Sequence, residues 1–186
     1  MRVAPEEEAE DVAIREFAGD RAVWGSGAAG RARRATLGRL LRAGVAAEAA
    51  VAAAEEFGAD GSDVAAQLAT RFAHAYAALL AEAGRWPCVP RAVLRRPLRM
   101  YNNSVRSAEG YLAAMDACLR TYYSLRPEDV EFLLELTGPD GRGAGGINAA
   151  AEAFANLKDM GFPVDTIRTT MRERGPEHAI EALCLL

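Results

Sequence analysis

The chain has 186 residues, 51% of them hydrophobic and only 7% aromatic, which is enough apolar surface for one sizeable core or a row of small ones. Its formal net charge of −4 argues against general affinity for nucleic acid, whose phosphate backbone attracts basic proteins. No apolar run approaches the roughly 20 residues of a membrane span, so we expect no membrane-spanning helix.

The pattern of apolar residues predicts helices along the whole chain. Period-two alternation, which is typical of strands, is almost absent, and much of the apolar content is alanine, which favours helix. We therefore predict an all-α protein, a helical array that ends in a compact three-helix bundle. Ser62 is a suitable N-cap for the helix that follows it. The expected helices cover residues 11–17, 32–42, 46–57, 62–82, 91–96, 104–123, 127–137, 149–159, 163–174 and 177–186.

Two glycine-rich breaks indicate how the chain is divided. Glycines between residues 25 and 30 end a partly flexible N-terminal segment, 1–30. Residues 138–146 form a linker that is too rich in glycine for a helix or a strand. A helical region, 31–137, lies between the breaks, and a compact domain, 147–186, follows the linker.

The C-terminal domain combines three short amphipathic segments with sharp turns. Met160-Gly161-Phe162 ends the first segment, because glycine can adopt the left-handed conformation that reverses the chain. Ile167 and Met171 lie four residues apart on the second segment, and Ala179-Ile180 with Leu183 form an apolar stripe on the third. This pattern is similar to that of the ubiquitin-associated (UBA) domain family.

The resemblance implies a small bundle that docks on the hydrophobic face of ubiquitin through an apolar patch. In that family the patch is formed by the Met-Gly-Phe loop and the end of the third helix. Carried over to this chain, the docking residues are Met160, Gly161, Phe162, Leu183 and Cys184. The chain departs from the family in two respects. The connection 172–177 is about two residues shorter than usual, and Cys184 stands where a second leucine is common.

Weaker versions of the pattern occur upstream. Leu40-Leu41-Arg42-Ala43-Gly44-Val45 resembles the loop region, with Ala-Gly-Val in place of Met-Gly-Phe. A second candidate begins at residues 80–84 and continues at 102–112. Two degenerate units that share helices would resemble the solenoid of overlapping UBA domains in an ESCRT-I subunit. The alternative is that alanine-rich helices resemble one another by chance.

The chemistry-bearing residues favour neither an enzyme nor a metal protein. Cys88, Cys118 and Cys184 are widely spaced and odd in number, which predicts reduced thiols. With His74 and His178 alone, a zinc cluster lacks ligands. No nucleophile is paired with a base at a helical spacing. We expect a cytoplasmic, non-enzymatic protein without a cofactor, since its acidic start is unlike a signal peptide.

The leading functional hypothesis is a ubiquitin-binding adaptor in endosomal sorting or degradation. Its expected partners are ubiquitin, ubiquitinated proteins and ESCRT-type sorting machinery. The alternative is a helical scaffold whose UBA-like end packs internally or on a partner other than ubiquitin. A third hypothesis is a nucleic-acid-associated protein that uses the arginine clusters at residues 31–42 and 91–99.

Overall fold

The computed structural model describes residues 11–18, 24–138 and 146–184, and in these ranges every regular element is helical and no strand occurs. The all-α prediction is therefore confirmed. Along the chain lie η1 (Ile14–Ala18), α2 (Ala28–Arg42), α3 (Ala47–Phe57), α4 (Asp63–Ala81), η2 (Ala83–Arg85), η3 (Arg91–Leu94), α5 (Arg95–Met100), α6 (Val105–Thr121), α7 (Pro127–Thr137), α8 (Gly146–Asp159), α9 (Val164–Arg174) and α10 (Pro176–Cys184). No helix within these ranges is both long and apolar enough to cross a membrane.

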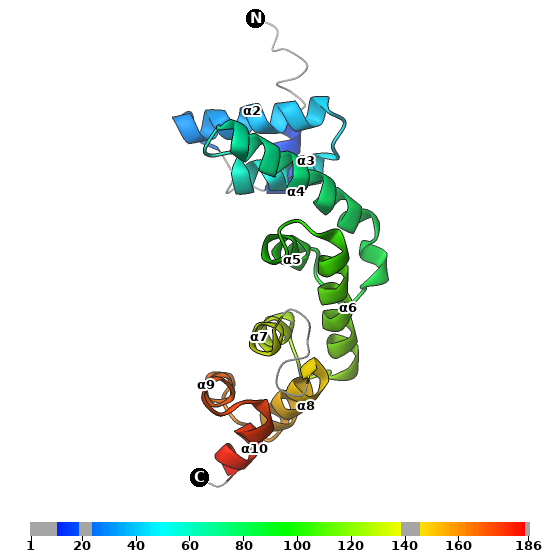
Figure 1. Cartoon of the computed structure of the whole chain (residues 1–186), viewed down its shortest axis with the longest axis vertical. Coiled ribbons are helices and arrows are strands. Elements are labelled where there is room, and N and C mark those ends of the chain that lie inside the picture. The colour runs from blue at the N-terminus through cyan, green and yellow to red at the C-terminus, as the bar shows by residue number, and fades with distance from the viewer. Residues whose placement is uncertain (1–10, 19–23, 139–145, 185–186) are drawn as a thin grey trace, which may run out of the picture. The chain divides into compact units, whose positions relative to one another are not determined.

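The chain forms two compact units, which are described separately. The first comprises residues 1–82 and 94–105, and the second comprises residues 83–93 and 106–186. In the first unit, α3 packs against η1, α2 and α4 (Figure 1). All six residues of the run 49–54 are buried, and five of them are alanine. Small side chains on every side of α3 let its neighbours approach closely, so α3 is the central helix of this unit.

Ion pairs connect elements of the first unit, and two of them join α5 to the central helix α3. Arg95 of α5 contacts Glu55 at 2.7 Å, and Arg99 is paired with Glu56. In the same unit, Arg34 of α2 contacts Asp11 at 2.9 Å. Several members of the arginine clusters are thus already paired with acids of the same unit.

Helix α2 begins earlier than the sequence suggests. Residues 28–30 are helical where we expected a glycine-rich break, and the expected boundary at residue 30 lies inside α2. Gly30 is buried, and a Cβ at this position would lie 1.7 Å from the carbonyl oxygen of Gly25. This glycine therefore allows close backbone contact and does not end a segment. The predicted N-cap is confirmed, because the Ala65 N–H donates to Ser62 Oγ at 3.2 Å.

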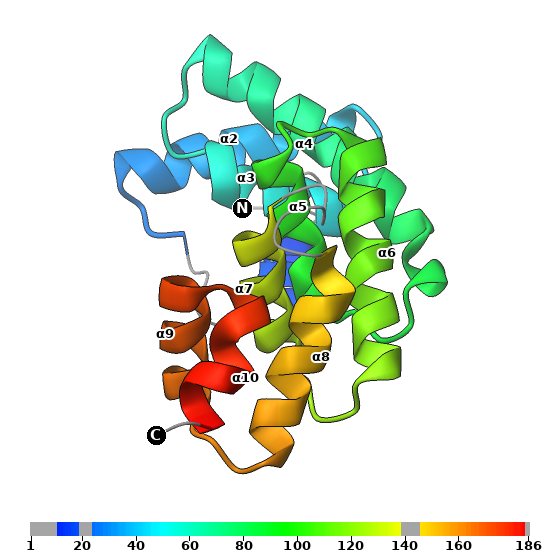
Figure 2. The same ribbon diagram turned by 60° about the horizontal axis from the view of Figure 1, so that its bottom comes forward.

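The second unit contains the expected C-terminal three-helix module. Helix α10 packs against both α8 and α9, as Figure 2 shows. The expected apolar residues Ile167, Met171 and Ala179 are fully buried in its core, together with Leu157 of α8. Most of the linker, residues 139–145, lies outside the described residues.

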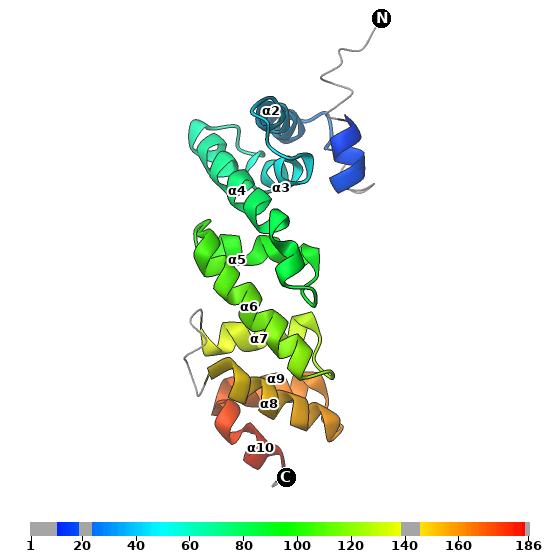
Figure 3. The same cartoon turned by 90° about the vertical axis from the view of Figure 1, so that its right-hand side faces the viewer.

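Helix α7 packs against this module, although the sequence placed it in a different domain. It lies against α8 (Figure 3), and the rings of Phe132 and Phe154 are 6.0 Å apart. The guanidinium groups of Arg168 and Arg172 on α9 lie 5.7 and 5.0 Å from the Phe132 ring. Such contacts stabilise by cation–π attraction as well as by apolar burial. The module is thus a four-helix structure.

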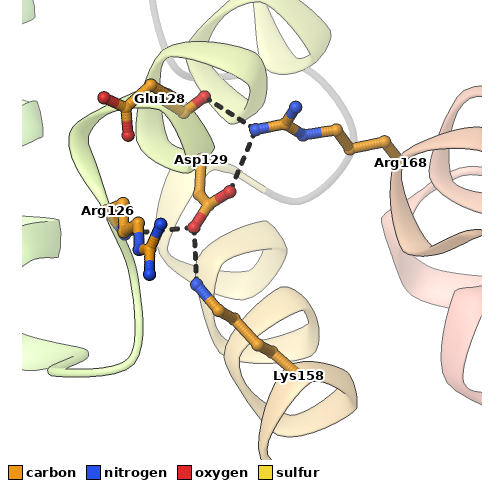
Figure 4. Close-up of polar contacts among 5 residues, drawn as sticks. All are labelled: Arg126, Glu128, Asp129, Lys158 and Arg168. Atoms are coloured by element: carbon orange, nitrogen blue, oxygen red, sulfur yellow. Dashed lines mark hydrogen bonds and ion pairs between the residues drawn. The ribbon is translucent and has the colours of Figure 1, made fainter. Parts of the chain in front are cut away.

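A buried carboxylate connects the helices of this structure. Asp129, in the first turn of α7, is 3% exposed. It caps its own helix by accepting from the Arg126 N–H at 3.1 Å. It also contacts Lys158 Nζ of α8 at 2.8 Å and Arg168 Nη2 of α9 at 3.0 Å (Figure 4). One side chain therefore ties α7 to both neighbouring helices.

We predict that Asp129→Asn lowers the free energy of unfolding by about 3 kcal/mol, because two basic groups lose their partner near the core. The loss falls at the lower end of that class, since the Lys158 side chain is 22% exposed and can be hydrated. Urea denaturation followed by circular dichroism measures the change. Asp159→Asn makes the same chemical change at an exposed position and is expected to alter stability by less than about 0.5 kcal/mol. Equal stability of the two variants would contradict the assigned role.

Candidate functional site

The Met-Gly-Phe turn has the geometry of a glycine-terminated helix end. Helix α8 ends at Asp159, and Gly161 has a φ of +91°. The Gly161 N–H donates to the Lys158 carbonyl at 3.0 Å, and the Phe162 N–H donates to the Leu157 carbonyl at 3.1 Å. These are the two hydrogen bonds of a Schellman motif, which satisfy the last carbonyls of the helix. Gly161 therefore shapes the turn that carries Met160 and Phe162.

This turn presents an apolar side chain to solvent. Met160 is 59% exposed, so it does not belong to the core of the module. Phe162 is partly exposed beside it. An exposed methionine on a rigid turn is well suited to a contact with another apolar surface, because its unbranched side chain adapts to irregular shapes.

The end of α10 lies at the same end of the module as the turn. Figure 2 shows α10 running in the same direction as α8, with α9 antiparallel to both. Cys184 is exposed there, whereas Leu183 is 6% exposed and packs into the core. Of the five predicted docking residues, Met160, Gly161 and Cys184 are exposed, Phe162 is partly exposed and Leu183 is buried. Met160, Gly161, Phe162 and Cys184, with Ile180, are called the docking surface below.

Ile180 belongs to the expected apolar stripe of the third segment but was not among the predicted docking residues. The structure buries Pro176, Ala179 and Leu183, which follow the three-and-four spacing of one helix face. Ile180 is one residue beyond that face and is 37% exposed. In the sequence, only Pro176 and Ala179 indicate which face of α10 is buried, because both are small residues that fit a tight contact.

The turn after α2 repeats this backbone geometry. Gly44 has a φ of +79°, and its N–H donates to the Leu41 carbonyl at 2.9 Å. The Val45 N–H donates to the Leu40 carbonyl at 3.1 Å. The surface differs, because Val45 is 7% exposed and a methyl group at Ala43 replaces the methionine side chain. The sequence similarity of the two loops thus extends to their hydrogen bonds and not to their apolar exposure.

The second upstream candidate does not form such a turn. Gly84 lies in the 3-10 helix η2, and it is not among the residues with positive φ. Left-handed backbone occurs instead at Asn102 and Asn103, after α5, with φ of 50° and 65°. Asparagine adopts this conformation more readily than other residues with a side chain.

The exposed titratable groups of α10 include Glu177 and Glu181. Elsewhere in the second unit, burial raises the pKa of the Cys118 thiol to about 11. No group of three or more histidine, cysteine, aspartate or glutamate side chains within the described ranges could hold a metal ion. What the surface offers is apolar contact beside exposed acids.

Two glycine substitutions distinguish the effect of backbone conformation on stability from the effect of the space available for a side chain. We predict that Gly161→Ala destabilises the protein by about 1 to 2 kcal/mol, because an L-residue is strained at this φ. Gly110→Ala, on the exposed face of α6, is expected to stabilise by about 0.5 to 1 kcal/mol. A Cβ would meet no heavy atom within 4 Å at either position. Urea denaturation of both variants gives the comparison, and effects of equal sign would contradict the Schellman assignment.

The described geometry consists of a rigid turn, an exposed methionine and the end of a neighbouring helix. A scan of protein-family models, a search of curated proteins and a search of solved structures each found no match to this chain.

Proposed function

We propose that the chain is a non-enzymatic ubiquitin-binding adaptor that docks through the Met160–Phe162 turn and the end of α10. The observation that carries the proposal is the exposure of Met160, 59%, on a turn fixed by two backbone hydrogen bonds. The pattern that resembles a UBA domain is therefore associated with an apolar side chain available for contact. Burial of Met160 and Phe162 in the core would have removed this support.

The size of the surface implies weak binding. A few partly exposed apolar side chains bury far less area than a standard protein interface. The net free energy of binding is therefore small once the loss of translational freedom is subtracted. We expect a dissociation constant on the order of 0.1 to 1 mM for one ubiquitin molecule. An adaptor with such an affinity suits multivalent recognition of ubiquitinated proteins. We place it in the cytoplasm, in endosomal sorting or degradation, alongside ESCRT-type machinery.

A second candidate function is a helical scaffold whose UBA-like end serves its own fold. The contacts of Asp129 with Lys158 and Arg168, and of Phe132 with Phe154, favour it, because they tie the module to α7. These contacts use the α7 side of the module, whereas Met160 is exposed. Only the first function requires an apolar partner at Met160, and binding experiments therefore distinguish them.

We predict that Met160→Ala weakens ubiquitin binding five- to thirtyfold, which corresponds to about 1 to 2 kcal/mol of lost apolar contact. The measurement is a titration of the ¹⁵N-labelled full chain with unlabelled ubiquitin, followed by chemical shifts. In the unmodified protein the shifts should concentrate at residues 160–162 and 180–184.

Val64→Ala is the matched control, because Val64 of α4 is an exposed apolar residue, 68% exposed, in the first unit. This variant should bind as the unmodified chain does. Circular dichroism should show that Met160→Ala is folded. Absence of shifts at millimolar ubiquitin, or equal affinities of the two variants, would sink the proposal.

The cysteines provide an independent footprint of the same surface. Cys88 and Cys184 are exposed, whereas burial raises the pKa of Cys118 to about 11, so only the first two should react at pH 8. We predict that saturating ubiquitin slows alkylation of Cys184 several-fold and leaves Cys88 unchanged. Mass spectrometry of tryptic peptides measures both rates in one sample. Equal slowing at both thiols would indicate a non-specific effect and count against docking at α10.

A further inference from the structure

A groove between α8 and α10 continues from the docking surface. It is lined by Ala149, Glu152, Ala153, Asn156, Pro176, Glu177 and Ile180. All of these residues lie on the two helices that run side by side in the same direction (Figure 2). Of its apolar members, Ala153 and Pro176 are buried and Ala149 and Ile180 are exposed, and the polar members are all exposed.

Helix periodicity makes the groove and the docking surface one face. On α8, Ala149, Ala153 and Asn156 follow spacings of four and three residues, and a further four residues lead to Met160. On α10, residues 177, 180 and 184 follow the same rule. Ile180 belongs to both the groove and the docking surface. A strip whose apolar members are Ala149, Ala153 and Ile180 therefore extends along α8 and α10 beyond the Met-Gly-Phe turn.

The charge along this strip is acidic and uncompensated. Glu152 and Glu177 line the groove and are exposed, and no basic side chain lines it. Neither carboxylate takes part in an ion pair within the described ranges. By contrast, the basic groups Lys158 and Arg168 on the other side of the module both contact the Asp129 carboxylate. The module thus presents negative charge beside its apolar strip.

We propose that this acidic groove is part of the docking surface and selects a folded protein whose apolar patch is bordered by lysine and arginine side chains. This inference rests on the proposed function and adds its electrostatic selectivity. Complementary charges at the edge of an interface raise the association rate and fix the orientation of the partner. Their effect is screened by salt, whereas apolar contact at Met160 is not.

The test compares two double variants that each remove two negative charges. Glu152→Gln/Glu177→Gln alters the groove, and Asp165→Asn/Glu173→Gln alters exposed positions on α9 that do not line it. Ubiquitin is the probe, at 20 mM and 300 mM NaCl, with the labelled full chain. The groove variant should bind about three- to tenfold more weakly at low salt. The difference should shrink at high salt, and the α9 variant should keep the affinity of the unmodified chain.

The outcomes separate this inference from the proposal on which it rests. Shifts along residues 149–156 and 176–180, together with a salt-sensitive loss in the groove variant alone, would support the acidic groove. Equal affinities of both double variants, with shifts confined to residues 160–162 and 184, would overturn the groove while ubiquitin docking stands. Absence of any ubiquitin binding by the unmodified chain would overturn both. Circular dichroism of each full-length variant verifies that it is folded.

Discussion

The buried carboxylate of Asp129 determines how the C-terminal half of the molecule is arranged. It caps α7, and it also holds one basic group from α8 and one from α9. A charge placed so far from solvent is tolerated only because several donors satisfy it. Its partners are thereby kept on the inner side of the module. The opposite side, along α8 and α10, is left with apolar and acidic groups.

The contacts of Asp129 also compensate for the small size of the C-terminal three-helix module. Three helices of 14, 11 and 9 residues enclose too little apolar area for a stable core of their own. Phe132 and neighbouring apolar residues of α7 enlarge that core, and the Asp129 contacts fix the orientation of the added helix. The Met-Gly-Phe turn thus belongs to a larger packed structure than the three helices alone would form.

Sequence patterns among neighbouring residues predicted most of the helices and turns. They did not predict the contacts between residues that are far apart in the sequence. Alanine-rich periods, the Ser62 cap and the turn at Gly161 depend on neighbouring residues, so the sequence reveals them. Gly30 was misinterpreted as a break, because the sequence does not show that a glycine is needed there for close backbone contact with Gly25. In the sequence, Asp129 is recognisable only as an acid near the start of the predicted helix 127–137, because its partners lie 29 and 39 residues away. The exposure of Ile180 depends on which face of α10 meets α8 and α9.

In the proposed function, Met160 contacts ubiquitin from a module against which α7 packs. Methyl labelling with ¹³C tests it directly, because the chain has five methionines and Met115 and Met171 are fully buried. Nuclear Overhauser effects should connect the Met160 methyl group to methyl protons of unlabelled ubiquitin, and none should reach the two buried methyl groups. Ubiquitin contacts at another methionine with none at Met160 would contradict the account.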